Sequence, residues 1–221
     1  MYVSAQIFPS SMNTLARVSI IGGVLLIAFG GGGAMAFYRS PFVTRVNEAI
    51  TQEVPFSHRH HVAGLGIDCR YCHTSVETDA FAGIPPTETC MTCHSQVWTD
   101  APMLQPVRDS WATGEPLEWT RVNDVPDFVY FNHSIHIDRG VGCVTCHGQV
   151  DQMPLMSKGQ TLHMQWCLQC HKAPEKFIRP KSEVYNLNYE PAEDQQTLGA
   201  RLVEEYGIQK SQLTNCSVCH R

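Results

Sequence analysis

The sequence predicts a mainly α-helical protein with extensive irregular loops and one N-terminal transmembrane helix. Three observations lead to this fold class. Residues 18–38 form an uncharged, mostly apolar run. All ten cysteines fall in five C-x-x-C pairs, each followed directly by histidine, a spacing that suits short helices. The whole chain contains 16 glycines and 13 prolines, and no long periodic segment occurs beyond residue 38. Both features predict long loops and little sheet.

The apolar run, VSIIGGVLLIAFGGGGAMAFY, is long enough to cross a membrane. A helix of its length extends for about 31 Å, which matches the hydrocarbon core of a bilayer. Arg17 precedes it and Arg39 and Arg45 follow it, so the basic residues do not orient it. Ala34-Met35-Ala36 resembles a signal-peptidase site, which makes a cleaved signal peptide the alternative. The run is longer than a typical signal-peptide core, and we therefore expect a retained anchor.

The five cysteine motifs have the pattern C-x-x-C-H. In chain order, their residues are Cys69, Cys72 and His73; Cys90, Cys93 and His94; Cys143, Cys146 and His147; Cys167, Cys170 and His171; Cys216, Cys219 and His220. Disulfides would not require the histidine, and zinc sites use C-x-x-C units in twos, whereas five is odd. C-x-x-C-H is the attachment pattern of haem c, in which two thiols bind the vinyl groups and the histidine binds the iron.

The sequence therefore predicts five covalent haem c groups in a haem-packed multihaem cytochrome c domain. Because haem c is attached outside the cytoplasmic membrane, we expect residues 39–221 on the periplasmic side of a single-pass bacterial membrane protein. Residues 1–17 would then form a cytoplasmic tail, and residues 18–38 the transmembrane helix.

An internal repeat supplies candidates for the distal iron ligands. VPFSHRHHVAGLGIDCRYCH (54–73) and FVYFNHSIHIDRGVGCVTCH (128–147) both carry F-x-H-x-x-H, a glycine-containing turn and C-x-x-C-H. The alignment equates His58 with His133 and His61 with His136. We expect His58 and His133 to serve the haem of their own repeat, and His61 and His136 to cross to neighbouring haems. Two di-haem units follow, at about 54–94 and 128–171, with a fifth haem at 216–220.

The fifth distal ligand stays open among four residues, His163, Met164, Met153 and Met156, of which the first two are the nearer to a motif. His60 breaks the repeat register and is expected to be solvated. An iron with two protein ligands has no open position, so we expect electron transfer rather than bond chemistry, and no catalytic residue.

The remaining sequence excludes several functions. The formal net charge is −5 with no lysine or arginine cluster, so nucleic acid is not expected as a partner. No nucleotide-binding glycine loop, nucleophile elbow or H-E-x-x-H motif occurs. Residues 95–127, which contain three tryptophans, are either a strap against a partner subunit or packing for haem edges. Residues 192–206 have the pattern of an amphipathic helix.

The repeat units resemble those of class III multihaem cytochromes. The stretches GIDCRYCHTSVE, FAGIPPTETCMTCH, PDFVYFNHSIH, GVGCVTCHGQVDQM, MQWCLQCHKAPEKFIRPKSEVYN and LTNCSVCHR are more specifically similar to the pentahaem cytochrome c subunits of alternative complex III, over about residues 40–221.

This resemblance implies an electron-transfer subunit of a membrane quinol-oxidising respiratory or photosynthetic complex. Its implied partners are quinol-binding membrane subunits, an iron–sulfur protein related to molybdopterin oxidoreductases, and a mono-haem cytochrome c. Electrons would leave to a soluble cytochrome c or a copper protein. The alternative is a self-contained quinol dehydrogenase that feeds a periplasmic reductase, since such cytochromes also have one membrane helix and several haems.

Overall fold

The computed structural model describes residues 7–220, and the chain divides into two compact units, Met1–Arg45 and Val46–Arg221. Six residues of the predicted tail (1–6) and Arg221 lie outside the described residues.

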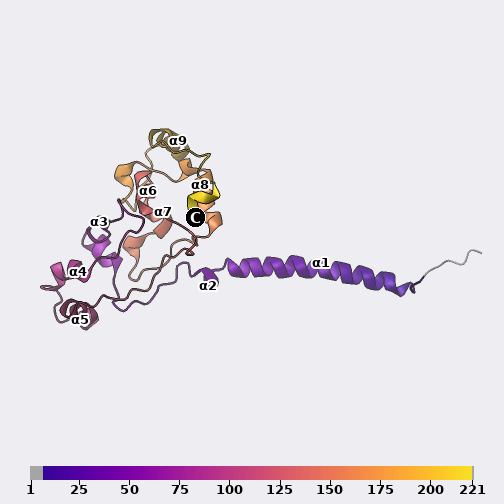
Figure 1. Ribbon diagram of the computed structural model, residues 1–221, viewed down its shortest axis with the longest axis horizontal. Helices are drawn as coiled ribbons and strands as arrows, with labels where there is room; N and C mark the ends of the chain where they lie inside the picture. The colour runs from indigo at the N-terminus through magenta and orange to yellow at the C-terminus, as the bar shows by residue number, and fades with distance from the viewer. Residues whose placement is uncertain (1–6, 221) are drawn as a thin grey trace, which may run out of the picture. The chain divides into compact units, whose positions relative to one another are not determined.

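The first unit is dominated by one long helix, α1, Ser11–Tyr38 (Figure 1). It contains the apolar run at 18–38 and begins seven residues earlier, just after Pro9. Its end fits the rule that helices stop before proline, because Pro41 opens the next short helix, α2, Pro41–Thr44. With a mean hydropathy of 2.0 over its most apolar window, α1 is long and apolar enough to cross a membrane, a test that a signal sequence also passes.

The second unit is built from short helices and loops, as the sequence predicts. Among residues 46–220 there is no strand, only three isolated β-bridges. The helices are η1 (Arg59–Gly64), α3 (Cys69–Cys72), α4 (Thr87–His94), η2 (Pro102–Leu104), α5 (Gln105–Thr113), α6 (His133–Asp138), α7 (Cys143–His147), η3 (Val150–Gln152), α8 (Met164–Lys172), η4 (Pro174–Lys176), η5 (Lys181–Glu183), α9 (Gln195–Glu205) and α10 (Cys216–Cys219). The five motifs lie on α3, α4, α7, α8 and α10 (Figure 1).

Local sequence signals explain where three of these helices begin. The Asp68 carboxylate accepts a hydrogen bond from the Arg70 backbone N–H at the start of α3. Asn132 caps α6 in the same way, and Asp194 caps α9, which lies within the helix predicted over 192–206. Such caps satisfy backbone donors that have no partner inside the helix. Side-chain caps thus define where α3, α6 and α9 begin, and α3 carries the first motif.

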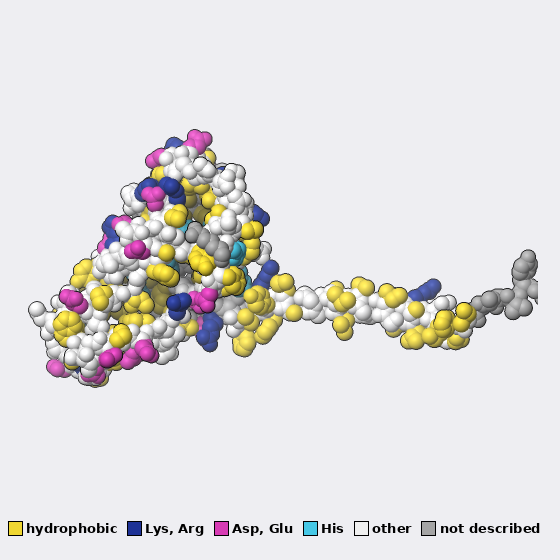
Figure 2. All heavy atoms as spheres, in the orientation of Figure 1, with side chains coloured by type: hydrophobic (Ala, Val, Ile, Leu, Met, Phe, Trp, Pro, Cys, Tyr) yellow, Lys and Arg dark blue, Asp and Glu magenta, His cyan; other side chains and the backbone are white. Residues whose placement is uncertain are grey.

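The aliphatic core is too small for a unit of this length. Only two clusters of buried residues occur among the described residues, one around Val141, Ile178, Leu198 and Leu202, the other around Val54, Leu104 and Val107. Large apolar side chains remain exposed elsewhere, including Phe81, Ile84, Phe128, Tyr130 and Ile135. Figure 2 shows such hydrophobic side chains together with histidines on one face of the unit. Such an excess of exposed apolar surface indicates that a ligand, a partner protein or a membrane covers part of it.

One close contact fixes α9 in the larger cluster. The helix packs on η4 at Gly199, where a Cβ atom would overlap the Glu175 carbonyl group. Gln195 donates two hydrogen bonds from its amide nitrogen, to the carbonyl oxygens of Glu175 and Ile178, both at 2.9 Å. The α9 helix therefore braces the segment that follows the fourth motif.

Candidate haem sites

Each predicted distal histidine of the repeats faces the histidine of a motif. His58 faces His73, with ring centroids 6.5 Å apart, and His133 faces His147 at 6.2 Å. These are the pairs within one repeat that the sequence predicts. His61 faces His94 at 6.3 Å and His136 faces His171 at 6.2 Å, so the second histidine of each repeat crosses to the following motif.

The separation within these pairs matches two imidazoles on opposite sides of one metal ion. A metal–imidazole bond is about 2.0 Å long and the nitrogen lies about 1.1 Å from the ring centroid, so two rings on one metal have centroids about 6.2 Å apart. All four pairs lie between 6.2 and 6.5 Å. Two neutral imidazoles in direct stacking contact would be closer, and the gap therefore fits an iron with a ligand on each side.

A phenylalanine positions both histidines in each repeat. Phe56 stacks on His61 at 4.4 Å and meets the edge of His58 at 4.9 Å. In the second repeat, Phe131 stacks on His136 at 4.5 Å and meets His133 edge-on at 4.7 Å. The F-x-H-x-x-H pattern is therefore one three-dimensional unit used twice, and the structure reproduces the sequence alignment of the two repeats.

The ring nitrogens have the protonation that metal binding needs. In seven of the nine paired or motif histidines, Nδ1 lies 2.7–3.1 Å from a backbone carbonyl oxygen; the residues are His61, His73, His94, His133, His136, His171 and His220. A carbonyl oxygen only accepts, so Nδ1 carries the proton. In a neutral ring, Nε2 then keeps its lone pair for the iron, the arrangement that orients metal-binding histidines in general.

Burial keeps two of these imidazoles neutral. It lowers the pKa of His58 to about 4, with smaller effects from the charges of His73 and His61. It lowers the pKa of His147 to about 4 as well, followed by the effects of His133 and His73. The Nδ1 atom of His58 is buried without a hydrogen-bond partner in the described structure. These rings are therefore held as unprotonated ligands rather than as cations.

The competing chemistries fit less well. None of the ten cysteines, all of which lie among the described residues, is joined in a disulfide. Among residues 7–220, no group of three or more histidine, cysteine, aspartate or glutamate side chains could hold a metal ion by itself. A four-ligand zinc site is thus missing from the described part, whereas two imidazoles per iron are what a porphyrin site requires.

The thiols of successive sites lie near one another. In the free thiol form, burial is the largest cause that raises the pKa of Cys72, and the second cause is the charge of the nearby Cys90. Burial raises the pKa of Cys143 to about 11, and the next cause is Cys69. Burial raises the pKa of Cys146 to about 12, and the next cause is Cys170.

The fourth and fifth motifs are also neighbours, because a thiol of one affects the pKa of a thiol of the other. The pKa of Cys167 is raised by burial and then by Cys219. The imidazole of His171 in the fourth motif also donates a hydrogen bond to the Leu213 carbonyl, just before the fifth. The motifs therefore lie in one continuous row, in the order second, first, third, fourth and fifth.

Direct contacts support this order. The hydroxyl groups of Tyr71 and Thr92 are hydrogen-bonded at 2.9 Å, which joins the first motif to the second. His133, which faces the third motif, is held through its backbone N–H and its ring by the carbonyl of Ala80, seven residues beyond the first motif. The first motif thus stands between the second and the third.

The fifth site is the least complete. His220 donates through Nδ1 to the Phe128 carbonyl at 3.1 Å, and its ring meets the Phe128 ring at 5.7 Å. Of the four candidate distal ligands, His163 precedes α8, and the neighbouring Met164 is exposed. The Met153 sulfur accepts a hydrogen bond from Ser157 at 3.6 Å. The choice among these residues and Met156 therefore stays a prediction.

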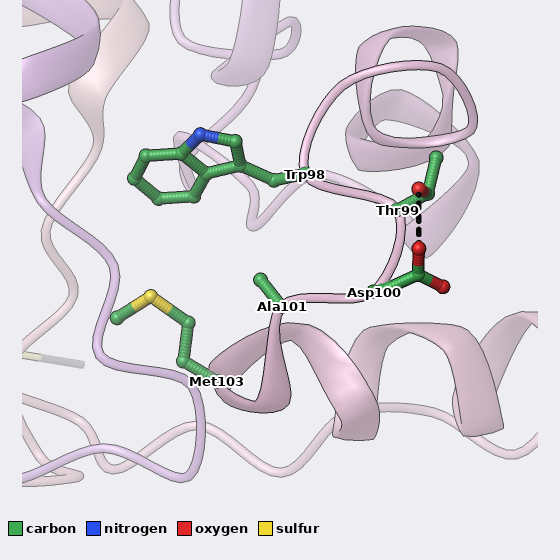
Figure 3. A pocket seen from close by; sticks show the side chains of 5 residues that line it. All are labelled: Trp98, Thr99, Asp100, Ala101 and Met103. Atoms are coloured by element: carbon green, nitrogen blue, oxygen red, sulfur yellow. Dashed lines mark hydrogen bonds between the residues drawn. The ribbon is translucent and has the colours of Figure 1, made fainter.

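An open cavity of about 520 Å³ lies beside the second site. Figure 3 shows the Trp98 indole and the Met103 side chain directed toward the same open space, with Asp100 turned away and hydrogen-bonded to Thr99. Trp98 also stacks on His60 at 5.9 Å, next to the ligand candidate His61. His60 is thus partnered by an indole and does not face a motif histidine.

Sequence reasoning missed the residues that orient the histidines. The carbonyl groups that accept from Nδ1 carry no sequence signal, because any residue supplies one. Phe56 and Phe131 do carry one, since they are the constant first position of the repeat. Buried Arg179, beside the third motif, has no pattern that distinguishes it from a surface arginine.

Comparison with known proteins indicates the same class of protein. Residues 129–221 match the family described as cytochrome c7 and related cytochrome c. The matched region contains the second repeat's distal histidines and the last three motifs.

The chain is also similar to the protein named menaquinone reductase, multihaem cytochrome c subunit, from Nitratidesulfovibrio vulgaris. The two are 29% identical over 137 residues, which is 61% of this chain and 64% of the relative. The match thus spans less than two thirds of the relative's own length. Site geometry and both comparisons therefore converge on one class, and the chain is similar to multihaem c-type cytochromes that work in electron transfer.

Proposed function

We propose that this chain is the electron-transfer subunit of a membrane quinol-oxidising complex, with five covalent haem c groups. The observation that carries the proposal is the set of four histidine pairs whose centroids lie 6.2–6.5 Å apart, next to C-x-x-C thiols. When bound, each haem supplies an iron that gains and loses one electron. In four sites the paired histidines would supply both protein ligands of the iron, which would leave no position there for a substrate.

The row of motifs supports a relay between two ends. The second motif forms one end and the fifth the other, with the first, third and fourth between them, as the thiol neighbours indicate. A relay needs partners at its ends, and the relative is named as a subunit of a menaquinone reductase. We propose quinone-binding membrane subunits, an iron–sulfur protein and a mono-haem cytochrome c as partners, as in alternative complex III.

We further propose that α1 anchors the chain and that residues 39–221 lie on the periplasmic side, with residues 1–17 in the cytoplasm. The length and hydropathy of α1 support the anchor. The periplasmic location follows from where thioether-linked haem is made. A reporter fused to each end of the full chain tests on which side of the membrane that end lies in cells. The N-terminal mass of the mature protein tests whether α1 is retained as an anchor.

The function is tested by purifying the chain from its native membrane in mild detergent. Mass spectrometry should find five haems on the intact polypeptide and identify the chains that accompany it. Quinol added under anaerobic conditions should reduce the haems of the complex and leave those of the separated chain oxidised. Full reduction of the separated chain would instead establish the self-contained quinol dehydrogenase. Reoxidation of the reduced complex by quinone, with no reduction by quinol, would reverse the proposed direction of electron flow.

A further inference from the structure

A buried arginine lies against the third motif. Arg179 is only 9% exposed, and its guanidinium group occupies the space beside Gly142, the residue directly before Cys143. A Cβ atom built on Gly142 would lie 2.7 Å from Nη1 of Arg179. The chain therefore needs glycine at this position for the cation to reach the motif.

The polar partners of this guanidinium are mostly neutral. Nη1 donates a hydrogen bond to the Asn186 carbonyl at 3.0 Å, and the guanidinium lies 5.0 Å from the centre of the Tyr189 ring. Nε has no hydrogen-bond partner in the described structure. The nearby Glu183 carboxylate accepts a hydrogen bond from the Asn186 side chain at 2.8 Å. No ion pair with a carboxylate is found for Arg179 among residues 7–220.

We propose that Arg179 is a positioning residue that raises the midpoint potential of the haem attached at Cys143 and Cys146. A nearby positive charge favours the reduced iron, which carries one positive charge less than the oxidised iron. The effect is large only where burial limits solvent screening, as it does here. This inference rests on the haem attachment proposed above.

Two electrostatic observations agree with the proximity. Burial lowers the pKa of Arg179, which is the direction expected for a cation removed from water. Among the causes acting on the pKa of the Cys143 thiol, Arg179 acts to lower it. The arginine is thus close enough to influence a charge at the attachment point.

The arginine of the first motif differs from Arg179 in its exposure and in its partners. Arg70 lies inside that motif, but its side chain is 50% exposed, and it pairs with Asp68 at 2.9 Å and with Glu77 at 3.6 Å. Solvent and two carboxylates offset its charge. Because the third motif is central in the row, the haem whose potential Arg179 raises is the one in the middle of the row.

The test is a redox titration of the purified full-length protein, followed by visible and electron paramagnetic resonance spectra. Arg179→Gln should move the midpoint potential of one haem downward and leave the other four in place. Arg179→Lys, which keeps the charge, should retain most of the wild-type value. Arg139→Gln removes an exposed arginine paired with Asp138 and serves as the matched control, with no shift expected.

A second variant covers the case in which Arg179→Gln does not fold. Gly142→Ala keeps the charge but displaces the guanidinium, so it should also lower one potential. Five bound haems with unchanged potentials in either variant would overturn the role of Arg179 and leave the proposed function intact. Absence of covalent haem from the wild-type protein would instead overturn the proposed function itself.

Discussion

Replacing His133 with alanine gives the sharpest test of the paired-histidine sites. His133 faces His147 at 6.2 Å with the rings 9° from parallel, and the change removes one of two axial ligands. One haem of five, or a fifth of the total, should become high-spin, while the thioether bonds to Cys143 and Cys146 remain. The ring's hydrogen bond to the Ala80 carbonyl is also lost, which destabilises the fold by about 1 kcal/mol. The backbone hydrogen bond from the same residue to Ala80 survives the substitution.

The assay combines intact-protein mass spectrometry, which counts haems, with electron paramagnetic resonance, which separates high-spin from low-spin iron. His60→Ala is the matched control, because His60 stacks on Trp98 and faces no motif histidine. The control should keep every haem low-spin. A wholly low-spin His133→Ala protein that still carries five haems would refute the pairing, and so would a high-spin signal in the control.

Three further predictions follow from other contacts. The rings of His61 and His94 are 68° apart, so their haem should give the large-g signal of crossed imidazole planes, whereas the near-parallel pairs should give ordinary rhombic signals in frozen-solution spectra. Cys216→Ala should lower the haem count by one, measured as intact mass, because the fifth motif lies at one end of the row and the other four keep their own thiols. Gly199→Ala should lower the free energy of unfolding by several kcal/mol, measured by chemical denaturation, because the new methyl group overlaps the Glu175 carbonyl in a buried contact.

A specific result would contradict each of these three predictions. Identical rhombic signals from every haem would contradict the crossed geometry at the second site. Loss of two or more haems from the Cys216 variant would show that the fifth motif supports its neighbours. For Gly199, Gly207→Ala is a useful comparison, because no atom lies within 4 Å of its Cβ position, although its positive φ of 63° adds backbone strain. A Gly199 variant no less stable than the Gly207 variant would mean that α9 shifts to make room.

The sequence predicts the sites better than it predicts their arrangement. Regular spacing identifies the cysteines and their histidines, and the F-x-H-x-x-H repeat predicts that His58 and His133 face their own motifs, as the structure shows. The partner of His61 depends on how the loop before α4 returns to η1, and no periodic pattern encodes that path. The contact between Arg179 and Gly142 likewise joins residues far apart in sequence, so only the folded chain shows it.

The helices illustrate the same division. The motif helices are short: α3, α7 and α10 have only four or five residues, about one turn, whereas α4 has eight and α8 has nine. Gly148 ends α7, and Pro174 lies just beyond the end of α8. The π-helix η1 was not predicted, because its wider turn depends on backbone hydrogen bonds rather than on side-chain pattern. Its position at His60 and His61 agrees with the tendency of such turns to occur at functional sites.

The two small aliphatic clusters have a consequence for how this polypeptide is made. If the chain is exported and carries the haems proposed above, so few apolar side chains among the described residues would let it gain its shape only as each tetrapyrrole is ligated. Until then it would be an open substrate for envelope proteases. Cells starved of iron or of the ligation machinery should therefore hold little of this polypeptide, even where its messenger is abundant.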